Sequence, residues 1–225
     1  MQALMDHARN LADRAEEFSH LAGGQSPQAL FITCSDSRVI PALITGARPG
    51  DLFELRTAGG IVPPYDPARR SGEMATIEYA VEILGVADIV VCGHSHCGAV
   101  GALVRGEDLA AAPAVEYLLR GEQPPALRAA ADDGPAPGEA SVPAVQEHVL
   151  RQLERLRDYP CVSARLTESR ITLHGWCYEV HTGLVTAHRG GGAGTPGGAD
   201  GASNPVGAGG ASNPVGAGGA GFAPL

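Results

Sequence analysis

Two short stretches of this sequence carry side chains suited to metal binding and acid–base chemistry. One reads LFITCSDSR, an apolar run that ends at Cys34, Asp36 and Arg38. The other reads ADIVVCGHSHCG, a run rich in β-branched residues that ends at His94 and Cys97. Two thiolates and one imidazole form a ligand set that Zn²⁺ favours. Asp36 lies two residues after Cys34, on the same side of an extended segment, so it can fill the fourth position or lie beside it.

Each of these apolar runs predicts a buried strand that delivers its polar side chains to one edge of a sheet. The runs are short, and polar turn residues follow them. Between them, Ser71 can cap a helix that carries an apolar stripe and ends at Gly85. The order strand, helix, strand predicts parallel strands with a right-handed crossover. Ligands of such sheets bind outside the carboxyl ends of the strands, where Cys34 and His94 would both lie.

The remaining patterns complete an α/β fold, with a mostly parallel central sheet flanked by helices and an antiparallel hairpin at its edge. Apolar residues at helical spacing in residues 1–22 predict an amphipathic helix that needs a surface to cover. The proline-rich span 106–141 predicts an excursion over the surface, with a short helix near 115–120. Further helices are expected at 39–45, 98–104 and 142–157, and further strands at 51–55, 171–180 and 184–188.

The chain divides by composition into residues 1–189, expected to be one folded domain, and residues 190–225. The second part is rich in glycine and alanine and contains GASNPVGAG twice, at 201–209 and 210–218. Such a segment buries too little apolar surface to offset its ordering entropy, so it is expected to be disordered. A solvated tail is the simplest interpretation, although a repeat of this kind can also recruit a partner.

The overall charge and the cysteines exclude several classes of function. A formal charge of -9 and a pI near 5.3 argue against a nucleic-acid partner and against an anionic membrane surface. No apolar run is long enough to predict a transmembrane helix, and nothing resembles a secretory signal. Five unevenly spaced cysteines do not form a disulfide framework. A cytoplasmic location, which keeps thiols reduced and able to bind metal, is therefore expected.

CSDSR followed by CGHSHCGAV resembles the β-class carbonic anhydrases, zinc enzymes that interconvert carbon dioxide and bicarbonate. The segments GQSP, GDLFELRTAG, IEYAVEILGV and HGWCYEVHTGLV also resemble the family, and the likeness covers about residues 4–189. The resemblance implies a lyase in which a zinc-bound hydroxide attacks carbon dioxide. It implies that Cys34, His94 and Cys97 bind the zinc.

The resemblance also assigns roles to residues around these ligands. Asp36 and Arg38 match a pair that switches the family between two states: the aspartate either ligates zinc, or is held away by the arginine. Gln25, Phe53 and Tyr79 match substrate-pocket positions that come partly from a neighbouring subunit. The implied assembly is a homodimer or a dimer of dimers.

Two positions depart from the family pattern. Phe31 occupies the place of a tryptophan that is linked with a bicarbonate-inhibited subgroup, so an open zinc with bound water is expected. Many members read AGN where this chain has Ala58, Gly59 and Gly60, which puts the packing of that loop in doubt but not the zinc.

Other interpretations remain open from sequence alone. Relatives with the same ligands hydrolyse carbonyl sulfide or carbon disulfide, and a non-catalytic zinc module would close its site with Asp36 as fourth ligand. Asp36 and Arg38 can form an ordinary salt bridge. His96 is expected to be a surface histidine, although it can also carry a proton from the site. Structural roles are expected for the thiols of Cys92, Cys161 and Cys177. The rings of Phe53 and Tyr79 can also be ordinary core aromatics.

Overall fold

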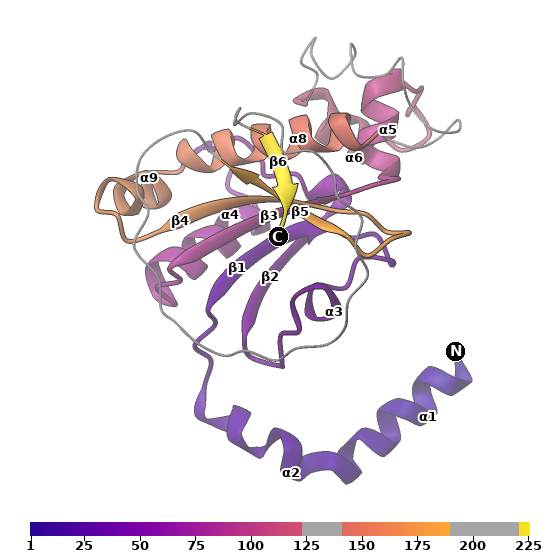
Figure 1. Cartoon of the computed structure of the whole chain (residues 1–225), viewed down its shortest axis with the longest axis vertical. Coiled ribbons are helices and arrows are strands. Elements are labelled where there is room, and N and C mark those ends of the chain that lie inside the picture. The colour runs from indigo at the N-terminus through magenta and orange to yellow at the C-terminus, as the bar shows by residue number, and fades with distance from the viewer. Residues whose placement is uncertain (123–140, 190–220) are drawn as a thin grey trace, which may run out of the picture.

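The computed structural model describes residues 1–122, 141–189 and 221–225, which build a six-stranded sheet in the order β2-β1-β3-β4-β5-β6 (Figure 1). The first four strands pair in parallel, and β5 and β6 are antiparallel. The predicted fold class is thus confirmed. The strands are β1 (Ala29–Cys34), β2 (Leu52–Thr57), β3 (Asp88–His94), β4 (Thr172–Tyr178), β5 (Val185–Arg189) and β6 (Gly221–Pro224).

Helices cover one face of the sheet and form the larger core against it. Alternate residues of the central strands point to this face, among them Leu30 and Ile32 of β1 and Ile89 and Val91 of β3. The opposite face carries a smaller cluster around Phe31, beside the short helix α3 (Pro41–Thr45). The covering helices are α4 (Gly72–Glu78), the π-helical turn η4 (Tyr79–Ile83), α8 (Val142–Arg157) and α9 (Pro160–Thr167).

Helix α8 lies closest to the sheet where β3 carries Gly93. A Cβ atom at Gly93 would come within 2.6 Å of Val145 and 2.7 Å of Val149. Ser141 caps this helix by accepting a hydrogen bond from the Ala144 amide at 3.4 Å, as Ser71 does for α4 from the Met74 amide. The helix is therefore fixed both at its start and along its length.

The end of the sheet where β1 and β3 finish carries three further elements. These are the short turn η3 (Ala58–Gly60), α5 (Gly98–Arg105) and α6 (Pro113–Arg120). The expectation of a purely superficial excursion after residue 106 is wrong in part, because Leu119 and Glu122 are buried. Residues 123–140 of that span lie outside the described residues.

The N-terminal segment forms helical turns that extend away from the sheet (Figure 1). It consists of α1 (Gln2–Asn10), η1 (Leu11–Arg14), α2 (Ala15–Phe18) and η2 (Ser19–Gly23). The predicted apolar stripe is present, but Leu4 is 70% exposed and only Phe18 and Leu21 are half-buried. Among the described residues, the apolar stripe is therefore mostly exposed and packs against little of the rest of the chain.

The prediction that residues 190–225 are disordered is wrong for the last five. Gly221–Pro224 forms β6 on the edge of β5, and the Leu225 amide donates to the Val185 carbonyl at 3.1 Å. The Phe222 ring lies 5.4 Å from the His188 ring and packs on the core, which supplies the burial that the glycine-rich sequence lacks. The repeat at 201–218 lies outside the described residues.

The close packing of α8 against β3 can be tested by a substitution at Gly93. Gly93→Ala should lower the free energy of unfolding by about 1–3 kcal/mol, since Val145 and Val149 must shift to admit the methyl group. Gly72→Ala is the matched control: no atom lies within 4 Å of its added Cβ, so a change within about 0.5 kcal/mol is expected. Urea unfolding at fixed protein concentration measures both, and equal values would contradict this packing.

Candidate metal centre

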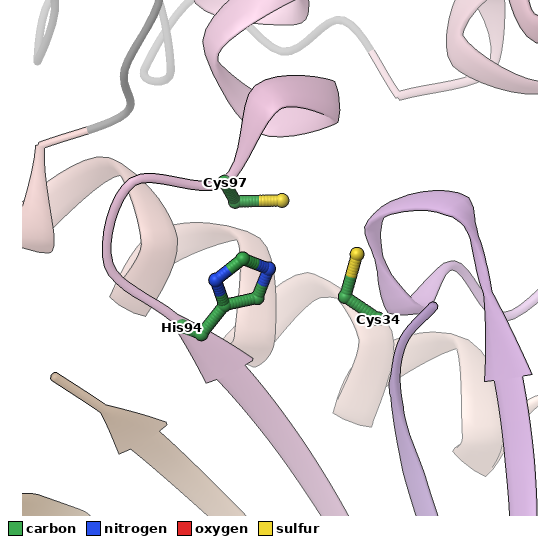
Figure 2. Close-up of side chains that lie close together, drawn as sticks. All are labelled: Cys34, His94 and Cys97. Carbon is green, nitrogen blue, oxygen red and sulfur yellow. The ribbon is translucent and has the colours of Figure 1, made fainter. Parts of the chain in front are cut away.

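Three side chains that could bind a metal ion converge where β1 and β3 end (Figure 2). Cys34 is the last residue of β1, His94 is the last of β3, and Cys97 is the N-cap of α5. Their sulfur, nitrogen and sulfur atoms all lie within 4.8 Å of one another, and all three residues are buried. Within the described ranges this is the group of His, Cys, Asp and Glu side chains whose spacing fits a metal ion. Parallel pairing of β1 with β3 is what brings them together.

The His94 ring is arranged as a metal ligand. Its Nδ1 lies 2.9 Å from the Ser95 carbonyl, an acceptor, so Nδ1 carries the proton and Nε2 keeps its lone pair. Nε2 is buried and, among the residues that the structure describes, has no hydrogen-bond partner. A buried nitrogen without a partner is costly, and a bound cation would satisfy it.

The two thiols shift each other's pKa in opposite directions. A hydrogen bond from Cys97 is the main cause that lowers the pKa of Cys34 to about 4, with further help from His94 and the Asp36 and Gly59 amides. The same contact, together with burial, raises the pKa of Cys97. A divalent cation would displace the proton of the second thiol and bind both sulfurs as thiolates, which is the donor set of a zinc site.

Asp36 lies beside the ligands and is held by Arg38 at two points. The Arg38 Nε donates to Oδ1 at 2.9 Å and its terminal nitrogen to Oδ2 at 2.7 Å. This grip is the main cause that keeps the pKa of Asp36 well below its usual range. Oδ2 remains 3.9 Å from Nε2 of His94, so the carboxylate borders the place where a metal would lie.

Arg56 fixes the turn that carries this pair, a role that the sequence did not suggest. Its guanidinium donates to the carbonyls of Cys34, Asp36 and Val39 at 3.1, 2.9 and 2.8 Å. A guanidinium can serve several carbonyls at once because its donors form a rigid fork. An arginine near the end of a neighbouring parallel strand was the available signal.

The paired glycines of η3 pack against the end of β1. Gly59 and Gly60 have φ of 76° and 65°, a region that suits glycine, and a Cβ at Gly60 would lie 3.1 Å from the backbone of Thr33. The Gly59 amide donates to Sγ of Cys34 at 3.3 Å. The loop is therefore well packed here without the asparagine of the family pattern.

The expected pocket residues lie away from the ligands of their own chain. Phe53 and Tyr79 stack with ring centroids 5.8 Å apart, and Tyr79 is 43% exposed. In the β1–β2 register, Phe53 pairs with Leu30 whereas Cys34 pairs with Thr57, a separation of about 13 Å along the strands. Gln25 is exposed and precedes β1. One chain thus supplies the ligands and the pocket residues at opposite ends of the sheet.

The other candidate side chains lie around or away from the centre. His96 is half-buried rather than on the surface, and its ring lies 5.5 Å from that of His181. Arg38 also donates to the His96 carbonyl at 3.0 Å. Cys92 and Cys177 are buried and Cys161 is half-buried, and none belongs to the ligand cluster.

Comparison with known proteins points to one family. A sequence model described as carbonic anhydrase matches residues 29–185. A carbonic anhydrase from Pseudomonas aeruginosa is 47% identical over 176 residues, which cover 77% of this chain and 79% of that protein. The structure of the β-carbonic anhydrase CcaA matches with a TM-score of 0.72 and 38% identity, covering 84% of this chain and 95% of that one. A structure from a study of two tetrameric β-carbonic anhydrases of Sordaria macrospora matches with a TM-score of 0.66 and 29% identity, covering 83% and 94%.

The ligand geometry predicts one tightly bound divalent ion per chain. Cys97→Ser should weaken binding of Zn²⁺ or Co²⁺ by at least about 100-fold, because the loss of a direct ligand costs more than the loss of a supporting contact. Cys161→Ser removes a half-buried thiol outside the cluster and should leave binding unchanged. Chelator competition and the thiolate-to-cobalt absorption bands measure the effect, and equal affinities in the two variants would contradict this assignment.

Proposed function

Because the chain belongs to the carbonic anhydrase family, within its β class, we propose that Cys34, His94 and Cys97 hold the zinc ion at which it works. The enzyme is a lyase that hydrates carbon dioxide reversibly to bicarbonate and a proton. The observation that carries the zinc assignment is the buried Nε2 of His94, which has no hydrogen-bond partner among the described residues and lies within 4.8 Å of the sulfurs of Cys34 and Cys97. When bound, zinc supplies a Lewis acid that makes water nucleophilic near neutral pH.

Asp36 and Arg38 are proposed to control access to the fourth zinc position. Arg38 holds both carboxylate oxygens, so Asp36 would remain beside a bound metal and leave the fourth position open to exchange with solvent. Since Arg38 lowers the pKa of Asp36 well below its usual range, the carboxylate stays ionised and would accept a hydrogen bond from the O–H of water or hydroxide at the metal. A non-catalytic zinc module would need Asp36 as a ligand, and the two-point grip of Arg38 disfavours it.

Gln25, Phe53 and Tyr79 are proposed to line the carbon dioxide pocket of a neighbouring subunit. About 13 Å of strand separates Phe53 from the level of Cys34 in one chain, so the pocket is reached in a homodimer or a dimer of dimers. The exposed apolar stripe of the N-terminal turns supports this assembly, because a second copy offers the surface that it lacks. The tetrameric Sordaria macrospora relatives are consistent with it.

We propose the cytoplasm as the location. Cys34 and Cys97 must stay reduced to bind metal, and a reducing compartment provides for this. In the described parts of the chain, no helix has the length and apolar content to cross a bilayer. Carbon dioxide is favoured over carbonyl sulfide or carbon disulfide as the substrate, because the relatives reported above are named carbonic anhydrases.

The gating role of Arg38 predicts a large loss of activity in a variant that keeps the charge. Arg38→Lys offers one point of contact instead of two, so Asp36 is freed towards the metal and stopped-flow hydration should fall about 10- to 100-fold. Arg48→Lys changes a side chain that is 88% exposed, and it should keep full activity. The zinc content of both variants should equal that of the wild type. Wild-type turnover in Arg38→Lys would rule out the gate.

The shared pocket predicts rescue between two inactive chains. One chain carries His94→Ala, which removes the metal, and the other carries Gln25→Ala with Tyr79→Ala, which removes the pocket. Randomly mixed dimers should regain about one quarter of wild-type activity, since half are mixed and each mixed dimer has one complete site. Pocket residues that act within their own chain would give no recovery, and stopped-flow assays before and after subunit exchange distinguish the two arrangements.

A further inference from the structure

A row of buried polar side chains on α8 grips the backbone of the loop next to the metal centre. His148, Gln152 and Arg155 are spaced by four and three residues and so share one face of the helix, and Tyr159 follows after the helix has ended at Arg157. His148 contacts the Gly59 carbonyl at 2.9 Å, and the Tyr159 hydroxyl donates to the Pro63 carbonyl at 2.8 Å. Of these two contacts, only the one to Gly59 involves a residue that itself contacts Cys34, because the Gly59 amide donates to Sγ of Cys34.

The hydrogen bonds around Gln152 fix which way its amide points. Its Oε1 accepts from the Val62 amide at 2.9 Å, and its Nε2 donates to the carboxylate of buried Glu122 at 2.9 Å. A backbone amide can only donate and a carboxylate only accepts, so oxygen and nitrogen cannot be exchanged. Arg155 pairs with the same carboxylate and holds its charge in the interior.

The contacts of the two ring nitrogens of His148 define its protonation. Nδ1 lies 3.4 Å from the Gln152 Nε2, whose N–H groups also face the His148 carbonyl at 3.3 Å, whereas Nε2 lies against the Gly59 carbonyl, which can only accept. The proton of the neutral ring is then on Nε2, which donates to the Gly59 carbonyl. Burial lowers the pKa of His148, in keeping with a neutral ring.

Gly59 is a residue that needs such an anchor. It and Gly60 both have positive φ, and two consecutive glycines leave a peptide free to rotate unless its polar groups are held. The Gly59 carbonyl is held by His148, while the Gly59 amide donates to Sγ of Cys34 (Figure 2 shows this sulfur facing His94 and Cys97). The two bonds fix the backbone on either side of the same α-carbon.

We propose that His148 is a positioning residue for the metal centre, which holds the Gly59 carbonyl so that the Gly59 amide stays directed at the Cys34 sulfur. The proposal rests on the proposed zinc site at Cys34. An N–H donor withdraws charge from a thiolate, so the sulfur donates less to the metal and the metal acidifies water more strongly. The row from Glu122 through Gln152 to His148 thus tunes the metal without touching it.

The test compares metal-loaded variants at His148 with a matched variant at Tyr159, just beyond the end of the same helix. His148→Phe keeps an aromatic ring of similar size and removes the donor, whereas His148→Gln restores a donor of similar reach. Tyr159→Phe removes the parallel bond to the Pro63 carbonyl and leaves Gly59 alone. His148→Leu replaces the Phe variant if that one does not fold.

In the cobalt-loaded proteins, His148→Phe should shift the thiolate-to-cobalt bands, lose metal to a chelator about 10- to 100-fold faster, and move the midpoint of the pH profile of hydration to higher pH. His148→Gln should return all three towards the wild type. Tyr159→Phe should lower the urea midpoint and leave the spectrum and pH profile unchanged. A wild-type spectrum and pH midpoint in His148→Phe would overturn the proposal even with hydration intact, as would equal shifts in Tyr159→Phe.

A second measurement needs no variant. In wild-type protein loaded with the NMR-active isotope of cadmium, the Gly59 amide proton should show scalar coupling to the metal through the Cys34 sulfur. Metal binding without that coupling would overturn the proposal, while a wild type that binds no metal would overturn the zinc site on which it rests.

Discussion

The parallel pairing of β1 with β3 is the constraint on which the site depends. It places Cys34 and His94 at neighbouring strand ends, and the turn after β3 returns Cys97 to the same point. Three buried metal-ligating atoms within 4.8 Å of one another are unfavourable by themselves, because the imidazole nitrogen has no hydrogen-bond partner among the described residues. The fold supplies the free energy that holds them together, and a cation would relieve the conflict.

Two sets of hydrogen bonds hold the backbone around this point. Arg38 and Arg56 hold the turn that carries Asp36, one through the carboxylate and the other through main-chain carbonyls. On the other side, α8 holds the glycine loop through His148. In both sets the side chains hold backbone or carboxylate groups next to Cys34, His94 and Cys97. The geometry of the site therefore depends on residues well separated from these three in the sequence.

The sequence predicted what depends on local pattern. Apolar runs ending in Cys34 and His94, the cap at Ser71, and the hairpin of β4 and β5 all follow from short-range periodicity and turn chemistry. It did not predict α9, whose eight residues carry only a weak apolar stripe. Nor did it predict that Glu122 is buried, because a carboxylate enters a core only when distant arginines meet it, and that pairing is a tertiary event. The roles of Arg56 and His148 were not predicted for the same reason, because both depend on contacts between residues distant in the sequence.

Strand β6 affects how readily the edge of this sheet can pair with another extended chain. The outer edge of a sheet presents unsatisfied amides and carbonyls that invite another extended chain, and Gly221–Pro224 occupies that edge along β5. Its Pro224 lacks an amide hydrogen, so the new edge is a poorer template at that position than the one it covers. Gly221–Pro224 therefore leaves less of the β5 edge open to pairing with another strand.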